Sequence, residues 1–159
     1  MGLSNNMIDS EPIRAFVESY SFLSNFHPSP MRVGELQCST AEHAYQALKT
    51  NVLEERQWVA AASTPGLAKK RGRQITLTSD WEANKIGVMA EVLIKKFEQN
   101  PALARQLALT GQRELVEGNY WHDQFWGDCE CTKHVNQTGR NMLGKLLMEL
   151  RTRMAARFE

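Results

Sequence analysis

The stretch Ser39–Lys49 contains the first side chains with chemical potential, because an acid and a histidine adjoin at the start of an expected helix. Thr40 is a good helix N-cap, since its hydroxyl can accept a hydrogen bond from a free backbone N–H one turn on. Glu42 and His43 then fall in the first turn, where the helix dipole favours a carboxylate and keeps Glu42 ionised. Two interpretations stay open: residues of a reactive site, or a capping acid beside a histidine of the core.

A cluster of cations follows in a short expected helix that begins at Thr64-Pro65, with Thr64 as its N-cap and Pro65 at its first position. The cations surround Gly72 and comprise Lys69, Lys70, Arg71 and Arg73. Such a cluster is usually a solvated face, or a set of cations at a helix C-terminus. The functional alternative is a phosphate site, with Arg73 suited to grip a phosphate through two parallel hydrogen bonds.

Residues 118–140 are rich in Gly, Asn, Asp, Trp and Cys and show no clear periodicity. A stretch of this length without regular structure is usually functional when it lies inside a compact domain. Its segment 119–128 alternates aromatic residues with acids and a histidine, which is typical of a pocket wall. The structural alternative is a loop that buried indoles hold in place.

The composition bounds the class of protein. The 159 residues suffice for one domain with a real core, and a net charge of +1 excludes a global basic field for nucleic acid. The three cysteines are odd in number, which favours a reducing cytoplasm over a secreted disulfide framework. Residues 1–10 lack a signal-peptide core, and no apolar run reaches transmembrane length.

The pattern of apolar residues predicts one α+β domain, predominantly α-helical, with a few short strands. Expected helices span residues 40–50, 53–62, 80–98 and 141–157, with shorter ones from Thr64 and from Asn100-Pro101 to about 110. Ser79 is the expected N-cap of the longest helix. Strands are expected at 13–20 and 114–117 and a hairpin at 31–38, while the prolines of 22–30 indicate a loop. We expect residues 1–12 to form a flexible leader and 13–159 the domain.

Several of these pieces together resemble one family, the NADAR domain or YbiA-like N-glycosidases. The resemblance covers about residues 20–151 and rests on blocks that occur in the family's order. They are Phe22-Leu23-Ser24-Asn25-Phe26, Ser39 to Ala47, Pro65 with Ala68-Lys69 and Gly72-Arg73, Trp81 with Lys85 and Met89, Thr110-Gly111 with Leu115-Val116-Glu117, Trp126-Gly127-Asp128, and Gly139-Arg140-Asn141 through Arg151.

This resemblance implies a YbiA-like fold and hydrolysis of an N-glycosidic bond, without a cofactor or a catalytic metal. Family members act on ribosylaminopyrimidine phosphates of riboflavin synthesis or remove ADP-ribose from guanine, so the implied partner is a small N-riboside phosphate or an ADP-ribosylated nucleobase, free or in DNA. Breaking a C1′–N bond builds positive charge on the ribose, which a carboxylate stabilises. Glu42 is the first candidate for that carboxylate and Asp128 the second.

The remaining roles also follow from the resemblance. Lys69 matches the family's motif lysine, whose amine can form a Schiff base with the ring-opened sugar if its pKa is lowered, and this slightly favours ADP-ribose. Arg73 would bind phosphate. The residues expected to hold ribose or base edges are Ser24, Asn25 and Asn141; those expected to stack on the base are Trp81 and Trp126; and Phe26, His43, Lys85 and Gly127 complete the substrate-binding set.

One segment departs from the family. Residues 129–134 replace the glycine-rich run that many relatives have after their Trp-Gly-Asp. Its Cys129, Cys131 and His134 could hold zinc with His122 or Asp123, although the spacing matches no common zinc module. Two other classes therefore stay open: a zinc-dependent hydrolase, and a non-catalytic module that binds ADP-ribose or another nucleotide without turnover.

Overall fold

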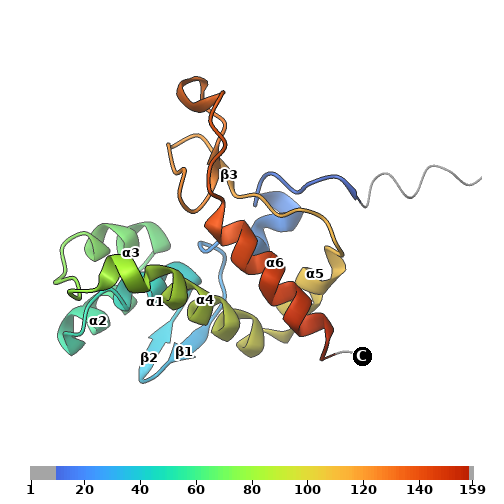
Figure 1. Cartoon of the computed structure of the whole chain (residues 1–159). Coiled ribbons are helices and arrows are strands. Elements are labelled where there is room, and N and C mark those ends of the chain that lie inside the picture. Colours follow the sequence, from blue (N-terminus) through green and yellow to red (C-terminus); the bar gives the residue numbers. More distant parts are fainter. Residues whose placement is uncertain (1–9, 158–159) are drawn as a thin grey trace, which may run out of the picture. The chain divides into compact units, whose positions relative to one another are not determined.

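The computed structural model describes residues 10–157 and confirms the predicted α+β class, a mostly helical single domain with short strands (Figure 1). The contacts of the chain cluster in two units. The first unit contains the described residues up to Ser24 together with those from Ala102 onward, and the second unit runs from Asn25 to Pro101. The predicted leader falls mostly outside the described residues, and its boundary at residue 13 stays a prediction.

The second unit begins with the hairpin that the sequence predicts. Strands β1 (Met31–Val33) and β2 (Leu36–Cys38) pair antiparallel, with Met31 opposite Cys38. Both strands alternate buried, exposed, buried, so one face of the hairpin packs against the unit's helices. Gly34 occupies the turn at a φ of +58°, a conformation that glycine adopts without the steric cost of a side chain.

Four helices follow in the second unit: α1 (Ala41–Ala47), α2 (Leu53–Ala60), α3 (Pro65–Gly72) and α4 (Trp81–Gln99). The predicted caps of α1 and α3 are confirmed, because the hydroxyls of Thr40 and Thr64 accept hydrogen bonds from the backbone N–H groups of His43 and Leu67. Ser79 was the wrong cap for α4. That helix starts one residue later, with Asp80 at the N-cap.

Helix α1 is the centre of the second unit. It packs against α2, α3, α4 and β2, and α1 to α3 lie side by side in Figure 1. All seven of its residues are buried, although the sequence predicts only an apolar stripe. The polar residues Glu42, His43 and Gln46 are therefore inside the protein, where each must satisfy its polar atoms by specific contacts.

The first unit contains the 3₁₀ helices η2 (Glu18–Leu23) and η3 (Thr132–His134), helix α5 (Pro101–Leu109, from Ala102 onward) and helix α6 (Met142–Ala155). Strands β3 (Gly118–Asn119) and β4 (Asp128–Cys129) pair in parallel. The buried face of α6 contains Leu143, Leu147, Leu150 and Met154. Buried Arg151 donates hydrogen bonds to the Thr110 hydroxyl at 2.9 Å and to the Arg113 carbonyl at 2.8 Å.

Two strand predictions in this unit were wrong. Instead of strands at 13–20 and 114–117, the structure has one isolated parallel bridge between Ile13 and Leu115. Residues Glu18–Leu23 form η2, which also takes in the start of the predicted loop 22–30. Period-two hydrophobicity over so few residues cannot distinguish a strand from a short helical turn. The sequence also missed β3 and β4, which are too short to show a pattern.

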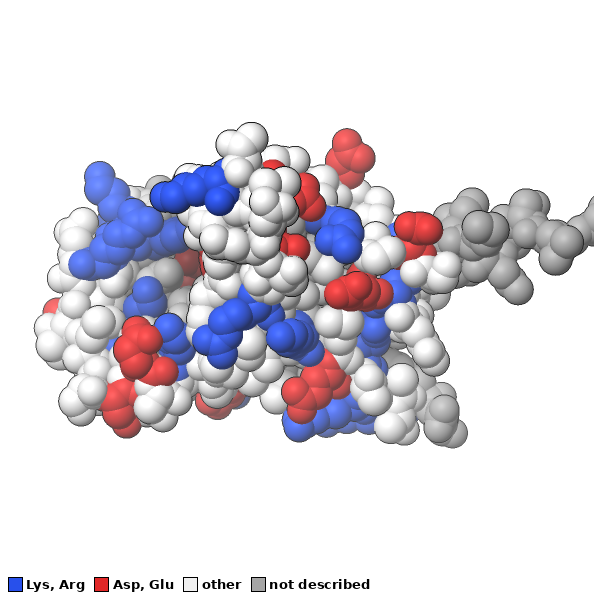
Figure 2. Space-filling view, turned by 45° about the horizontal axis from the view of Figure 1, so that its top comes forward, with Lys and Arg blue, Asp and Glu red and all other residues white. Residues whose placement is uncertain are grey.

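The charged side chains are mixed on the surface. Figure 2 shows Lys and Arg interspersed with Asp and Glu on the visible face, in agreement with the net charge of +1. Within residues 10–157, no helix combines the length and the apolar character needed to cross a membrane.

Two helical glycines give a matched test of the packing. A Cβ at Gly144 in α6 would overlap the Leu115 carbonyl oxygen and the Asn141 side chain, whereas a Cβ at Gly87 in α4 would meet open space. We expect Gly144→Ala to lower the free energy of unfolding by about 1–3 kcal/mol through overpacking. Gly87→Ala should raise it by up to about 1 kcal/mol, because alanine is the better helix former. Denaturant unfolding measures both, and equal effects would contradict the packing of α6.

Candidate functional site

The carboxyl of Glu42 lies in the first turn of α1 and is only 7% exposed. Its backbone N–H donates to the Asn25 carbonyl at 3.0 Å, and its Oε1 accepts a hydrogen bond from Gln46 Nε2 at 2.7 Å. Glu42 and Gln46 stand one helical turn apart on the same face, which brings their side chains together. The acid is thus fixed in position by its own helix and by the loop before β1.

Burial raises the pKa of Glu42 above its ordinary 4.5. Removal from water disfavours the charged form, and this effect outweighs the opposing influences of the Gln46 hydrogen bond and of the charges of Lys69, Lys49 and His43. The sequence showed only the helix dipole, which favours the ionised form; burial acts against it and was not visible in the sequence. A carboxyl of this kind can hold a proton and deliver it, as catalytic acids do.

His43 is held on both sides of its ring. Its Nε2 lies 2.9 Å from the Ala62 carbonyl and its Nδ1 lies 2.8 Å from the Thr40 hydroxyl. A carbonyl only accepts, so Nε2 carries a proton toward Ala62, and the Thr40 hydroxyl is the partner of Nδ1. These contacts favour a structural histidine, and the predicted contact of His43 with substrate stays a prediction.

Lys49 is a charged neighbour of Glu42 that the sequence did not single out. Its Nζ lies 5.4 Å from the centre of the Tyr45 ring and 5.9 Å from that of Trp81. Burial lowers the pKa of Lys49, the charge of Glu42 opposes this, and Lys69, Arg73 and Lys85 lower it further. The sequence signal was its position seven residues after Glu42, which is two turns along α1 and its extension.

These mutual effects define a group of cations in the second unit, in which Lys49 and Lys69 act on Glu42 while Arg73 and Lys85 act on Lys49. Three of the predicted residues belong to it, namely Lys69, Arg73 and Lys85, and Lys49 is the fourth member. Lys85 also forms an exposed ion pair with Glu82 at 2.7 Å. The neighbouring Arg71 is structural, because it donates to the Trp58 carbonyl at 2.6 Å and stacks on the Trp58 ring. With Glu82 counted, two carboxyls face these four cations, and the excess of positive charge is one that an anionic ligand would offset.

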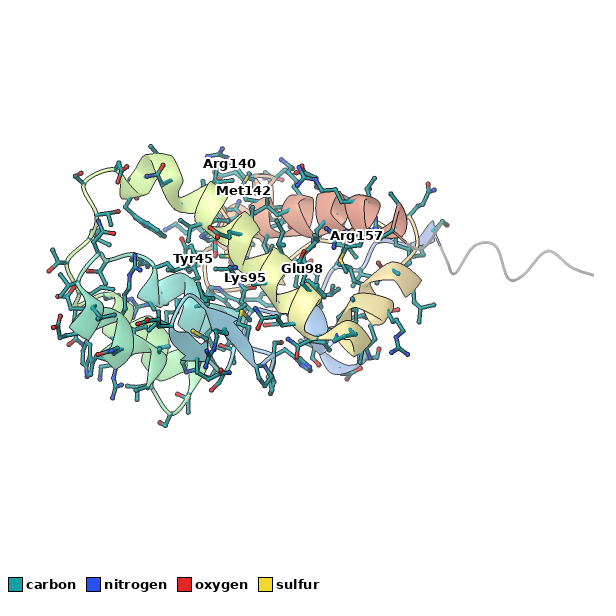
Figure 3. All side chains as sticks on the ribbon, turned by 90° about the horizontal axis from the view of Figure 1, so that it is seen from below. Tyr45, Lys95, Glu98, Arg140, Met142 and Arg157 are labelled. Carbon is teal, nitrogen blue, oxygen red and sulfur yellow. The ribbon has the colours of Figure 1, made fainter. Side chains whose placement is uncertain are left out.

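Trp81 is buried at the start of α4 and packs against Tyr45 of α1, with ring centres 5.3 Å apart. This contact helps to hold α1 against α4. Tyr45 is labelled in Figure 3. The predicted stacking of Trp81 on a base stays a prediction. Phe26 is 44% exposed in the same unit.

Two buried oxygens close to Glu42 accept no hydrogen bond within the described residues. They are Oδ1 of Asn25 and Oε1 of Gln46. A buried acceptor without a donor is costly and is a reason to expect a ligand or an ordered water at that place. Asn25 was predicted to bind substrate; Gln46 was not, since its side chain reads as an ordinary helix residue.

Gly72 allows α3 to approach this site. A Cβ at Gly72 would overlap the Gln46 side chain, which bonds to Glu42. A glycine is therefore required at position 72 for a steric reason: it leaves room for Gln46, which positions Glu42.

The other predicted residues belong to the first unit. Asp128 in β4 accepts a hydrogen bond from the Gly139 N–H at 2.7 Å. Gly127 is needed because a Cβ there would overlap the Glu117 carbonyl. Asn141, at a φ of +49°, accepts from the Glu117 N–H and donates to the Leu115 carbonyl, between Arg140 and Met142 at the start of α6 (Figure 3). Trp126 and Ser24 are half-buried. Their roles toward substrate stay predictions.

The raised pKa of Glu42 predicts how stability depends on pH. Folding raises this pKa, so the folded state holds the proton more tightly than the unfolded chain, and stability falls as pH rises from about 4.5 through the folded pKa. Glu42→Gln has no such loss. The melting temperature of the variant relative to that of the wild type should therefore increase across this window, as measured by thermal unfolding at a series of pH values.

Glu55→Gln is the matched control with the opposite sign. Hydrogen bonds from Thr50 and Thr76 lower the pKa of Glu55, so its contribution to stability is present above pH 4.5 and is lost as pH falls through the folded pKa. Relative to Glu55→Gln, the wild type should therefore gain stability as pH rises. If the melting temperature of Glu42→Gln relative to the wild type changed with pH in the same direction as that of Glu55→Gln, burial would not be what sets the pKa of Glu42.

Comparisons with known proteins identify relatives over most of this chain. The model of the NADAR domain matches residues 13–155. The chain is 36% identical to the N-glycosidase YbiA of Escherichia coli K12 over 140 residues, which are 87% of this chain and 84% of YbiA. It is 36% identical to an N-glycosidase of Nostoc punctiforme over 139 residues, 84% of this chain and 85% of that protein.

Two further matches extend the comparison. A riboflavin biosynthesis protein of Vibrio vulnificus is 35% identical over 136 residues, which are 84% of this chain and 35% of that longer protein. The NMR structure of Escherichia coli YbiA superposes with a TM-score of 0.80 at 32% identity, covering 99% of this chain and 95% of YbiA. The resemblance inferred from the motifs is thus confirmed, and the chain belongs to the NADAR domain family.

Proposed function

We propose that this protein hydrolyses the C1′–N bond of a phosphorylated N-riboside, with Glu42 as the carboxyl that acts on the bond. The substrate is either ADP-ribose attached to a nucleobase such as guanine, free or in DNA, or a ribosylaminopyrimidine phosphate. The observation that carries the proposal is the buried carboxyl of Glu42, with a raised pKa, beside Lys49 and Lys69, the first of which is in turn influenced by Arg73 and Lys85.

The enzyme class rests on the relatives. Two proteins named N-glycosidases match this chain over more than four fifths of both partners at 36% identity. A hydrolase that acts on N-glycosyl bonds is therefore the class of this enzyme. The Vibrio vulnificus protein, named for riboflavin biosynthesis, supports the ribosylaminopyrimidine phosphate as one of the two substrates.

The chemistry of the bond suits Glu42. The leaving base nitrogen needs a proton, and the ribose then carries positive charge at C1′ until water attacks. A carboxyl with a raised pKa can first donate the proton. The carboxylate that remains can then stabilise the cationic sugar or accept a proton from the attacking water. The unsatisfied oxygens of Asn25 and Gln46 can accept hydrogen bonds from sugar hydroxyls or base N–H groups.

The cations suit the phosphate. Burial is the largest cause of the lowered pKa of Lys49. Repulsion by the charges of Lys69, Arg73 and Lys85 lowers it further. A phosphate or diphosphate would relieve that repulsion and gain charge-assisted hydrogen bonds. The lowered pKa also makes Lys49 a second candidate, beside Lys69, for an amine that forms a Schiff base with a ring-opened sugar.

The proposal includes Asp128 as a second acid and Trp126 as a stacking surface, both in the first unit. It also places the protein in the cytoplasm, because all three of its cysteines are free, as in reducing compartments.

Glu42→Gln tests the proposed role of the carboxyl. Glutamine keeps the shape of the side chain but cannot donate an acid proton or carry a negative charge. Removing an electrostatic group of this kind typically costs about a hundred- to a thousandfold in rate, so kcat should fall at least that far while ligand binding persists. The measurement is the single-turnover release of base, followed by chromatography, on a panel of ADP-ribosylated guanine DNA and ribosylaminopyrimidine phosphates.

Glu55→Gln, the same change on α2, should leave that rate unchanged. A Glu42→Gln enzyme with near-wild-type turnover and stability lower by about 0.3–1 kcal/mol would show a capping acid instead. Tight binding of the panel by the wild type without any release of base would favour the non-catalytic binding module.

Arg73→Ala tests the phosphate site. Charge-assisted hydrogen bonds are worth about 1.5–3 kcal/mol, so KM for a phosphorylated substrate should rise about ten- to a hundredfold. KM for the matching unphosphorylated riboside should change little. Lys70→Ala removes an exposed cation from the same helix and serves as the control. If Arg73→Ala weakens both substrates equally, Arg73 is a structural arginine.

A further inference from the structure

Four metal-ligating side chains converge in the segment between β3 and α6, which is drawn in orange in Figure 1. They are His122, Cys129, Cys131 and His134, and one ligand atom from each lies within 4.8 Å of the others. All four belong to the first unit, and none has a role in the proposed glycosidase chemistry.

The four ligand atoms lie about as close together as the corners of a tetrahedral zinc site, with the two sulfurs closer than a bound ion would hold them. Zn–S bonds of about 2.3 Å and Zn–N bonds of about 2.0–2.1 Å give tetrahedron edges of about 3.3–3.8 Å. The two sulfurs are 3.0 Å apart, and the two Nδ1 atoms of the histidines are 3.4 Å apart. The Cys131 sulfur lies 3.3 Å from His122 Nδ1 and 3.1 Å from His134 Nδ1, and the Cys129 sulfur lies 3.9 Å from His122 Nδ1.

The backbone brings these residues together from two places. Cys129 is the last residue of β4, which is fixed on β3 by hydrogen bonds such as Glu130 N–H to the Asn119 carbonyl at 2.7 Å. Cys131 caps η3 and His134 ends it, so both fall on one short turn whose His134 N–H donates to the Cys131 carbonyl. His122 reaches the cluster from the β3–β4 loop.

His122 adopts a φ of +69°, which is unfavourable for a residue with a side chain. A metal bond to its ring would offset that cost. Asp123, the alternative fourth ligand in the sequence, is engaged elsewhere: its Oδ1 accepts hydrogen bonds from the N–H groups of Phe125 and Trp126. The structure therefore selects the histidine.

We propose that His122, Cys129, Cys131 and His134 bind one zinc ion as a structural site. Four protein ligands leave no open position for substrate or water, which distinguishes structural from catalytic zinc. The ion would join His122, in the β3–β4 loop, to the turn that follows β4. Trp126 and Asp128 lie between these two segments in the sequence. Such a site would stand where many relatives have a glycine-rich run. It would be structural, so the expectation that the enzyme uses no catalytic metal stays a prediction.

The direct test is the metal content of the untagged full chain, expressed with added zinc and purified under reductant. We expect about one zinc per chain by elemental mass spectrometry. Cys131→Ser and His134→Asn should each reduce this content to less than about a tenth. Cys38→Ala, which removes the cysteine outside the cluster, should leave it unchanged. Retention of zinc by both ligand variants would overturn the proposal.

The wild type alone gives a second readout in case a variant fails to fold. Cobalt in place of zinc should show the intense visible bands of a tetrahedral ion and a near-ultraviolet thiolate charge-transfer band. Chelation of zinc should lower the melting temperature and speed proteolysis within residues 120–134. Wild-type protein that contains no metal and whose thiols all react with a thiol reagent would overturn the proposal. A metal-free wild type in which Cys129 and Cys131 form a disulfide would overturn it as well.

Discussion

The burial of the Glu42 carboxyl is the constraint on which the second unit depends. Helix α1 is short and is covered on all sides, so this acid cannot reach bulk water as a first-turn glutamate usually does. Burying a carboxyl is tolerated only with compensating contacts. Gln46 supplies a hydrogen bond, Lys49 and Lys69 supply charge, and Gly72 lets α3 approach closely enough for this arrangement.

The same constraint gives the site its chemical character. Neutralising the one buried acid would take one cation, but Lys49 and Lys69 both act on Glu42. The pKa of Lys49 is lowered by burial and then by the charges of Lys69, Arg73 and Lys85. A protein that is only stabilising a buried acid has no need of the other three. An acid with a raised pKa, beside surplus positive charge and two unsatisfied acceptors, is instead suited to a ligand with a phosphate, hydroxyl groups and a base to be protonated.

Much of the scaffold could be predicted because its signals are local. Two helix starts were predicted from Thr40 and from Thr64 with Pro65. The hairpin turn was predicted around Gly34. The environment of α1 could not be predicted, because the sequence left Glu42 and His43 open between a reactive site and a capping acid beside a core histidine. Only the packing of α2, α3 and α4 shows that every residue of the helix is buried. Lys49 was overlooked for the same reason: its burial and its distance from the other cations are tertiary facts.

The segment 118–140 shows more clearly what could not be predicted from the sequence. Its composition predicted a functional loop, and its cysteines raised the possibility of zinc, yet the fourth ligand stayed open between His122 and Asp123. The choice depends on the parallel bridge of β3 with β4 and on the hydrogen bonds that occupy Asp123. Both are interactions between residues several positions apart, in strands too short to be recognised from hydrophobic alternation.

The most direct test of the central claim is to titrate the Glu42 carboxyl itself and compare it with the rate. Selective carbon-13 labelling of glutamate, with Glu42→Gln to assign the signal, gives the pKa of this carboxyl in the free enzyme, and base release across the same range gives the pH dependence of kcat/KM. The two should share an inflection, because kcat/KM reports the essential groups of the free enzyme. We predict that Glu42 titrates above 4.5 and that kcat/KM bends at the same pH. A carboxyl that titrates at or below 4.5, with kcat/KM unchanged through its pKa, would contradict the account.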